Sequence, residues 1–316
     1  MRLRPWSPGS PGRNAASPPA RCSICRAAAP LIDPSSAEDA SVLDEKLLSI
    51  NQVTLMEQWS LRQAIESLGR SGLGAISVWR DKMREIGAAE AARLIDGHGL
   101  AVSGLCFAGL ITSPDHAEAA KAMDEVRRAI DEAAEIKALC LVFVAGGVDP
   151  REKDIKAARA RALDRLAELV PHARGANVRL AIEPLHPMIC ATRSVVSTMA
   201  LANDWCDALG ADDVVGIAVD TYAVWWDPQL EAEIARAGKR ICAFHISDWL
   251  VDTQDVRLDR GMMGDGVIDI PAIRRMVEAA GYRGHREVEI FSARNWWKRD
   301  PDEVIRVIRE RYQSAV

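Results

Sequence analysis

The segments ALCLVFVAGG (138–147), EKDIKAARARALDRLAELVPHARG (152–175) and NVRLAIEPL (177–185) follow one another along the chain. The first and third are short and almost continuously apolar, which is typical of strands that are buried on both faces. The middle segment is long and repeats its apolar residues at helical spacing, so we expect a helix. A buried strand, a helix and a second buried strand make one βαβ unit with parallel strands.

The same alternation extends over the chain from about residue 47. Strands are expected at 47–55, 74–80, 100–109, 138–147, 177–185, 214–222, 241–249 and 285–291, each followed by a helical pattern. A doubly wound open sheet is the alternative, but it requires a glycine-rich turn after the first strand, and SINQVTLMEQWS (49–60) has none. Eight βα units at this length instead predict an α/β fold, a (β/α)8 TIM barrel over residues 46–316.

The first 45 residues differ in composition from the rest of the chain. They are rich in Pro, Ser, Ala and Arg and show no periodic apolar face. They also lack the continuous apolar stretch of a secretory signal. We therefore predict a disordered N-terminal leader over residues 1–45.

Composition limits the partners and the compartment. The net charge of −5 gives no general attraction to nucleic acid or to anionic membranes, so neither is expected as a partner. The longest apolar run (138–148) is too short to span a bilayer. Seven scattered cysteines, an odd number, indicate free thiols in a reducing compartment, and we expect a cytoplasmic protein. A homo-oligomer or a small partner subunit stays open.

Polar residues stand near the ends of the last four predicted strands. They are Glu183, Asp220, His245 and Glu289, which are 37, 25 and 44 residues apart, so each comes from a different strand. Catalytic residues of TIM barrels lie at the carboxyl ends of the strands. Because adjacent strands lie only about 4.8 Å apart, these four side chains can converge on one point.

Three carboxylates at one buried point repel one another unless a cation lies among them. Three oxygen donors and one imidazole suit a divalent ion such as Mn²⁺, Mg²⁺ or Co²⁺. We therefore predict one divalent ion, Mn²⁺ as first choice, bound by Glu183, Asp220, His245 and Glu289. A single such residue is more often a solvated carboxylate or a satisfied core histidine, but four on consecutive strands favour the ion.

Aromatic and charged residues surround the predicted metal site. His186 follows the strand-5 glutamate, two tryptophans follow the strand-6 aspartate, and a 20-residue loop (247–266) follows the strand-7 histidine. Loops of that length are usually functional, and aromatic rings beside polar groups suit sugars. Rim packing of the tryptophans and solvated salt bridges of the arginines are the alternatives. The predicted substrate-binding residues are His186, Trp225, Trp226, Asp248, Trp249, Arg257 and Arg260.

Five motifs carry a resemblance to a known family: AIEPLHP (181–187), VDTYAVWWDP (219–228), FHISDW (244–249), GDGVIDI (264–270) and GYRGHREVEIF (281–291). From about Leu47 onward the chain resembles the xylose-isomerase-like TIM barrels of the sugar phosphate isomerase/epimerase superfamily. The resemblance implies that a Glu–Asp–His–Glu quartet, here Glu183, Asp220, His245 and Glu289, holds one divalent metal. It also implies that the two glutamates are catalytic and exchange a proton with the substrate carbon.

The resemblance implies a metal-dependent sugar isomerase or epimerase that acts on a small carbohydrate through an enediolate. One departure affects the substrate, because many relatives have a histidine where this chain has Ala223. A lyase or dehydratase on an inosose or a 3-oxo-glycoside, of the C- or O-deglycosidase type, is the alternative with the same metal site. A DNA-repair endonuclease needs more histidines than His186 and His245 at the site, and a non-catalytic sugar-binding subunit predicts a lost quartet member.

Overall fold

The computed structural model describes residues 42–316, so the predicted leader lies, up to residue 41, outside the described residues. Eight parallel strands form a closed barrel in the order β1-β10-β7-β6-β5-β4-β3-β2. The predicted TIM barrel is therefore confirmed. The barrel strands are β1 (Leu48–Asn51), β2 (Ala75–Trp79), β3 (Ala101–Gly109), β4 (Leu141–Val144), β5 (Leu180–Ile182), β6 (Val215–Asp220), β7 (Ile241–Ile246) and β10 (Arg286–Val288).

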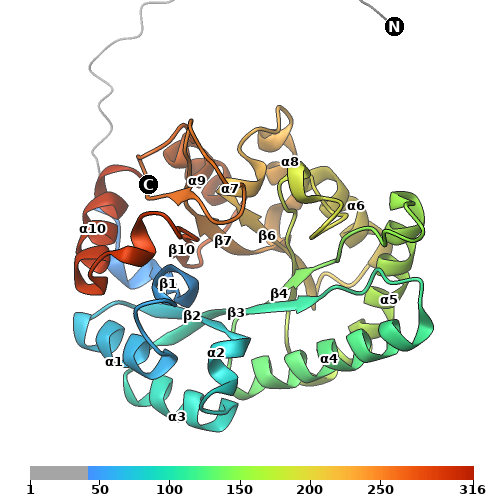
Figure 1. Cartoon of the computed structure of the whole chain (residues 1–316), viewed down its shortest axis with the longest axis horizontal. Helices are drawn as coiled ribbons and strands as arrows, with labels where there is room; N and C mark the ends of the chain where they lie inside the picture. The colour runs from blue at the N-terminus through green and yellow to red at the C-terminus, as the bar shows by residue number, and fades with distance from the viewer. Residues whose placement is uncertain (1–41) are drawn as a thin grey trace, which may run out of the picture. The chain divides into compact units, whose positions relative to one another are not determined.

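Helices surround the barrel on its outer side (Figure 1). In the described part of the chain, no helix has both the length and the apolar composition that a membrane crossing requires. The α-helices are α1 (Leu61–Ser71), α2 (Arg80–Arg84), α3 (Ala88–Gly97), α4 (His116–Glu135), α5 (Ile155–Ala176), α6 (Met199–Leu209), α7 (Thr221–Val224), α8 (Leu230–Ala237), α9 (Ile270–Ala279) and α10 (Pro301–Ser314). Short 3-10 turns are η1 (Glu45–Leu47), η2 (Gln52–Leu55), η3 (Pro187–Ile189), η4 (Gly238–Arg240) and η5 (Trp296–Lys298).

Helix α1 shows how the local sequence sets these elements. Ser60 caps its start and exchanges hydrogen bonds with Gln63 in a capping box, a type of contact worth about 1 kcal/mol. Gly72 ends the helix at φ 74°, a left-handed conformation that glycine adopts without steric cost. Its buried residues recur at helical spacing, so one face packs on the barrel: Leu61, Ala64, Ile65 and Leu68.

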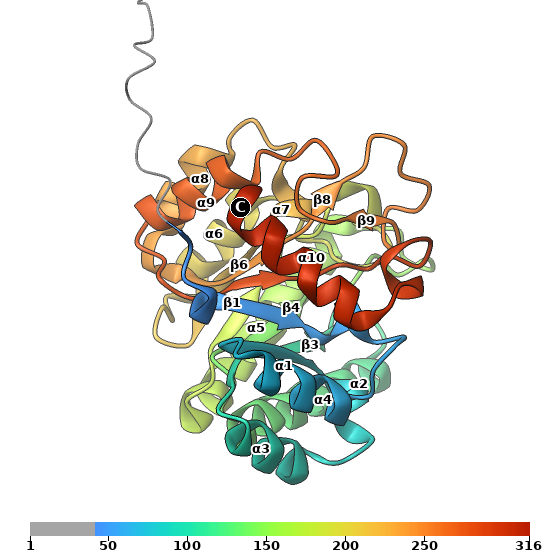
Figure 2. The same ribbon diagram turned by 90° about the vertical axis from the view of Figure 1, so that its left-hand side faces the viewer.

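All eight predicted strands are shorter in the structure, and two of them show a clear cause. The first ends at Asn51, because the Asn51 side chain accepts the N–H of Val53 at 3.0 Å and starts the turn η2. The segment 241–249 divides after β7, and its last two residues form β8 (Asp248–Trp249), which pairs antiparallel with β9 (Arg260–Gly261). The sequence did not predict this ribbon, which Figure 2 shows beside the end of the barrel to which the strand arrows point.

The barrel interior is lined by small and polar side chains, while the outward faces of the strands carry the large apolar residues that meet the helices. Side chains two residues apart on a strand point to the same face. Thus Ala181, Ala218 and Ala243, which form a separate buried cluster with Cys140, lie two residues before Glu183, Asp220 and His245. These small side chains therefore lie on the same inward faces as the three charged residues, one step earlier along each strand.

Candidate active site

Strand register brings the four predicted metal ligands to one level of the barrel. Asp220, the last residue of β6, is paired with His245 of β7, which is paired with Glu287 of β10. Glu183 and Glu289 come directly after β5 and β10. All five side chains are buried, so their charges interact with little screening by water.

Three of the four predicted ligands meet directly. Nδ1 of His245 lies 2.8 Å from Oε1 of Glu183 and 3.8 Å from Oε2 of Glu289. One candidate ligand atom of each residue lies within 4.8 Å of the other two. An imidazole nitrogen and two carboxylate oxygens at this spacing fit a single divalent ion.

Asp220 adds a fourth candidate ligand, with one carboxylate oxygen that has no hydrogen bond among the described residues. Its Oδ1 accepts the N–H of Tyr222 at 3.0 Å, whereas its buried Oδ2 has no hydrogen-bond partner among the described residues. Nη1 of Arg260 lies 3.1 Å from that Oδ2 and 3.0 Å from Oε2 of Glu289. A buried carboxylate oxygen without a hydrogen bond needs positive charge beside it, which Arg260 supplies and to which a divalent ion would add.

Arg260 is fixed at the edge of the cluster by aromatic rings. Its guanidinium carbon lies 4.5 Å from the ring centre of Tyr222 and 4.9 Å from that of Phe291. Nη1 also donates to the main-chain oxygen of Glu289 at 3.2 Å. Burial disfavours the charged guanidinium, but Asp220 and Glu289 outweigh this effect and raise the pKa of Arg260. The side chain therefore remains a positive charge.

Without a metal ion, the cluster retains protons. Burial raises the pKa of Glu289 from 4.5 to about 8, and the charges of Glu183 and Asp220 act in the same direction. Burial alone would lower the pKa of His245, but Glu287, Glu183 and Glu289 outweigh it and raise that pKa well above 6.5. A divalent ion would take the place of these protons, since metal ligands bind in their deprotonated forms.

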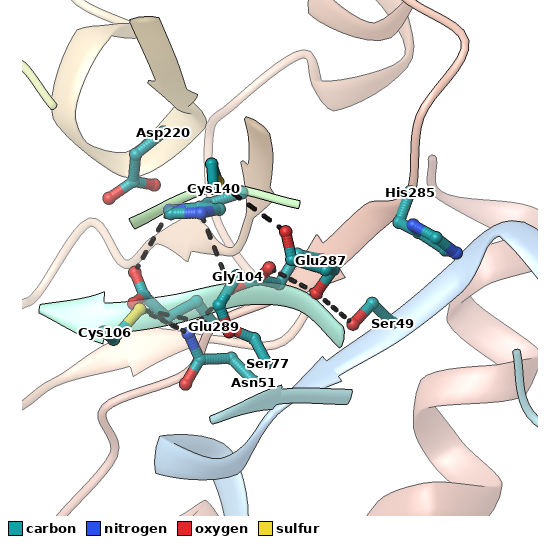
Figure 3. Close-up of polar contacts among 12 residues, drawn as sticks. Ser49, Asn51, Ser77, Gly104, Cys106, Cys140, Asp220, His285, Glu287 and Glu289 are labelled. Carbon is teal, nitrogen blue, oxygen red and sulfur yellow. Dashed lines mark hydrogen bonds and ion pairs between the residues drawn. The ribbon is translucent and has the colours of Figure 1, made fainter. Parts of the chain in front are cut away.

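A fourth buried carboxylate, Glu287, lies beside the cluster (Figure 3). Its Oε1 accepts from Nδ2 of Asn51 at 2.7 Å and its Oε2 accepts from Oγ of Ser103 at 2.8 Å. Oγ of Ser49 lies 2.7 Å from Oγ of Ser103 and extends the network. Oε1 of Glu287 also lies 3.5 Å from Nε2 of His245, on the side of the imidazole that faces away from Glu183.

Asn51 is oriented by its own neighbours. Its Oδ1 accepts from Nε1 of Trp79 at 2.7 Å and from the N–H of Val53 at 3.0 Å. Its Nδ2 consequently points to the carboxylates, where it donates to Glu287 and, at 3.1 Å, to Oε1 of Glu289. The amide therefore connects Glu287 of β10 with Glu289, which comes directly after that strand.

A pocket opens above the cluster and brings most of the predicted site residues together. Trp79, Phe107, Tyr222 and Phe291 provide aromatic walls. Ala223, at the position where the family resemblance implies a histidine, is part of the lining. Predicted residues that line the pocket are Glu183, His186, Asp220, Arg257, Arg260 and Glu289, and His245 is fully buried at the cluster.

Four predicted substrate-binding residues are not part of this lining. Both carboxylate oxygens of Asp248 accept main-chain N–H groups of the loop that follows β9, from Gly264, Gly266 and Ile268 at 2.9 Å, so Asp248 holds the loop in place. The three tryptophans pack behind the wall instead. Trp249 stacks on His186 and Tyr222, Trp226 meets His186 edge-on, and Trp225 packs on Trp249.

Sequence reasoning missed Asn51, Glu287 and Arg193, the last of which also lines the pocket. The sequence carried a signal for Glu287, because it lies two residues before Glu289 on a strand and must share its face. Asn51 was hidden inside the predicted first strand. Arg193 lies in an irregular segment after η3, where no sequence periodicity predicts which way a side chain points.

A sequence profile described as xylose isomerase-like TIM barrel matches residues 63–311. Among solved structures, the protein SMc04130 from Sinorhizobium meliloti 1021 has 51% sequence identity and a TM-score of 0.84, over 86% of this chain and 99% of that chain. No match was found among curated protein sequences.

Two more distant structures share the fold. The IOLI protein, whose structure has a bound zinc atom, gives a TM-score of 0.75 at 19% identity, over 85% of this chain and 97% of that one. The 3-keto-D-glucoside 4-epimerase YcjR from E. coli gives a TM-score of 0.68 at 17% identity, over 86% of this chain and 100% of that one.

Proposed function

Since the chain belongs to the xylose isomerase-like TIM barrel family, we propose that it is a divalent-metal-dependent isomerase or epimerase of a small carbohydrate. The observation that carries this proposal is the position of two buried glutamates, Glu183 and Glu289, which line one pocket and lie within 3.8 Å of Nδ1 of His245. The structural neighbour YcjR is a 3-keto-D-glucoside 4-epimerase, which supports this class of reaction.

Glu183, Asp220, His245 and Glu289 would hold the ion. Their mixed oxygen and nitrogen donors suit Mn²⁺ first, with Mg²⁺ or Co²⁺ as alternatives, and the zinc atom of the IOLI structure supports a divalent ion on this scaffold. When bound, the ion supplies a Lewis acid that polarises a substrate carbonyl. Glu287 would accept the Nε2–H of His245, which leaves Nδ1 unprotonated and directed to the ion.

The two glutamates would carry the proton. Either Glu183 or Glu289 removes a proton from the carbon next to the substrate carbonyl, which forms an enediolate. Return of the proton to the opposite face of the same carbon gives an epimer, and return to the neighbouring carbon gives an isomer. Because both carboxylates border the pocket, one can accept the proton and the other can return it.

The second candidate is a lyase on an inosose or a 3-oxo-glycoside, and Ala223 favours it. Its methyl group lines the pocket at the position where the family resemblance implies a histidine, so the site lacks one contact to a substrate hydroxyl. The first step is the same proton removal. The enediolate then expels a leaving group from the next carbon, and the products have a lower mass than the substrate.

The test is incubation of the Mn²⁺-loaded protein in D₂O with a panel of keto-sugars, inososes and 3-oxo-glycosides. Deuterium at the carbon next to the carbonyl, with unchanged product composition, supports the isomerase or epimerase. Loss of water or aglycone supports the lyase. If none of these substrates shows exchange or a mass change, proton removal is not what this site does.

The proposal includes the cytoplasm as the compartment. The five cysteines in the described part of the chain form no disulfide, which agrees with a reducing environment.

A further inference from the structure

Two arginines face the pocket from separate loops. Arg193 follows η3, beyond the end of β5, and Arg257 lies in the segment between β8 and β9. Both line the pocket that Glu183 and Glu289 border. They are distinct from Arg260, whose charge is already matched by Asp220 and Glu289.

Neither Arg193 nor Arg257 has a carboxylate within ion-pair distance or a side-chain hydrogen bond anywhere in residues 42–316. Most other arginines in this range have an ion pair or a side-chain hydrogen bond, as Arg151 has with Asp149, and apart from these two only the exposed Arg275 has neither. The guanidinium of Arg193 instead lies over the ring of Phe107, 5.1 Å from its centre. That ring is a pocket wall, so the charge is held at the pocket.

The two positive charges are close enough to act on each other. Burial lowers the pKa of Arg193, the charge of Arg257 lowers it further, and Glu183 opposes the shift. Two guanidinium groups that repel each other beside a partly apolar pocket are destabilising unless an anion joins them. The planar donor fork of arginine matches the oxygens of a carboxylate or a phosphate.

We propose that Arg193 and Arg257 form an anion-binding subsite, and that the natural substrate is a sugar derivative with a carboxylate or phosphate group. This inference rests on the proposed function, because it assigns the polyol part of the same substrate to Glu183 and Glu289. The subsite fixes the charged end of the molecule at the pocket mouth. A neutral sugar would leave both arginines without partners.

The kinetic test compares a neutral keto-sugar, its phosphate ester and the matching keto-sugar acid in the D₂O exchange assay. The variants are Arg193→Gln, Arg257→Gln and the double variant, with Arg306→Gln as the matched control, since Arg306 pairs with Glu310 on the outer helix α10. We expect each pocket variant to lower kcat/KM for an anionic substrate on the order of 10- to 100-fold more than for the neutral sugar. The ester and the acid distinguish phosphate from carboxylate.

A binding test separates this inference from the proposed function. Calorimetric titration of the wild-type protein with inorganic phosphate, and separately with acetate, needs no turnover. Binding that weakens in Arg257→Gln, but not in Arg306→Gln, supports the subsite even if no sugar exchanges deuterium. Because Arg257 is exposed, its replacement does not threaten folding.

The opposite result overturns the subsite alone. If neutral sugars exchange as well as charged ones, and the arginine variants affect both equally, the arginines do not recognise an anion. The isomerase proposal would stand in that case. Failure of exchange with every substrate, together with phosphate binding that depends on Arg193 and Arg257, would instead reject the isomerase and keep the subsite.

Discussion

The barrel interior contains two polar layers that differ in how completely their groups are paired. The lower layer consists of Ser49, Asn51, Ser103 and Glu287, and the upper layer of Glu183, Asp220, His245 and Glu289. In the lower layer, both oxygens of Glu287 accept hydrogen bonds from neutral donors. In the upper layer, Oδ2 of Asp220 and Nε2 of His245 are buried without a hydrogen bond, and each has only a charged neighbour, Nη1 of Arg260 at 3.1 Å and Oε1 of Glu287 at 3.5 Å.

The difference separates the buried polar groups whose hydrogen bonds the protein supplies itself from those that a ligand can still engage. Leaving a buried polar group unpaired costs about 1–3 kcal/mol, so unpaired groups persist where another function requires them. Glu287 and Glu289 occupy the same strand end in the same buried surroundings. They differ in that Glu289 borders the pocket and pairs with the charged Arg260, whereas Glu287 accepts its hydrogen bonds from neutral donors and does not line the pocket. Glu287 is therefore a fixed support, and Glu289 is a group that an ion or a substrate can engage.

Replacing His245 breaks both layers at once, and we expect the largest effect from it. His245→Ala removes the nitrogen that Glu183 and Glu289 approach and the imidazole that contacts Glu287. The variant should lose its bound divalent ion and its activity, whereas circular dichroism should still show a folded barrel. Elemental analysis of wild type and variant measures the ion. Active wild-type protein without any metal would contradict the upper layer as a metal site.

Glu289→Gln breaks the upper layer alone. It keeps the size of the side chain and removes the base, so we expect deuterium exchange at saturating Mn²⁺ to fall on the order of 10²–10⁴-fold. Glu183→Gln should have a similar effect. The matched control is Glu310→Gln, an exposed glutamate on α10. Exchange at the wild-type rate in both pocket variants would assign the proton to another group.

Glu287→Gln tests the lower layer. The amide can still accept a hydrogen bond but no longer offers a charge to Nε2 of His245, and we expect Mn²⁺ affinity to weaken about 10–100-fold. Asp248→Asn is the control, because Asp248 is buried and hydrogen-bonded to main-chain N–H groups outside both layers. That variant should lower the melting temperature and leave the affinity for Mn²⁺ unchanged. Equal affinity in Glu287→Gln and wild type would make Glu287 a packing residue only.

A change of pH should have the smallest effect, and it tests the upper layer in the unmutated protein. In the metal-free protein, the pKa of Glu289 is raised from 4.5 to about 8. A raised carboxyl pKa contributes stability below pH 4.5 that is lost as the pH rises toward 8. His245, whose pKa is also raised, acts in the same direction. The melting temperature of chelator-treated protein should therefore fall over this range.

The matched experiment repeats the pH series with Mn²⁺ present and with Glu289→Gln. Bound Mn²⁺ replaces the proton, so its stabilising effect should grow as the pH rises. The variant should show a flatter decline without metal, because Gln does not ionise. If the melting temperature of the metal-free protein instead rises from pH 5 to 8, Glu289 and His245 do not retain their protons in the folded state.

The fold and the main residues of the upper layer follow from sequence pattern. Alternation of buried strands with helices placed Glu183, Asp220, His245 and Glu289 on consecutive strands, and register in a barrel leaves little freedom in where such residues go. The positions of these four residues follow from the alternation of apolar and polar residues along the chain, which can be seen in a single sequence.

Pairing of side chains depends on distances that a sequence does not display. Nothing in the sequence shows that Asp248 faces the main-chain N–H groups of Gly264 and Gly266 and not a substrate. Arg193 was missed for a similar reason, since it reaches the pocket from an irregular segment. The three tryptophans follow the strand ends as expected, but they do not line the pocket. Trp249, for example, stacks on His186 and so supports a residue of the pocket wall.

The short ribbon of β8 and β9 has a consequence for how the substrate range of this protein could change. The ribbon joins the two ends of the loop between β8 and β9, and Trp249 is paired with Arg260 there. Gly266 packs against this ribbon, where the Cβ of any other residue would lie 2.2 Å from the main-chain oxygen of Trp249. Residues 250–258, including Arg257, form the tip beyond this closure. Insertions, deletions or exchanges in the tip therefore leave Arg260 beside the upper layer, so selection or engineering can alter recognition while the reaction chemistry is inherited intact.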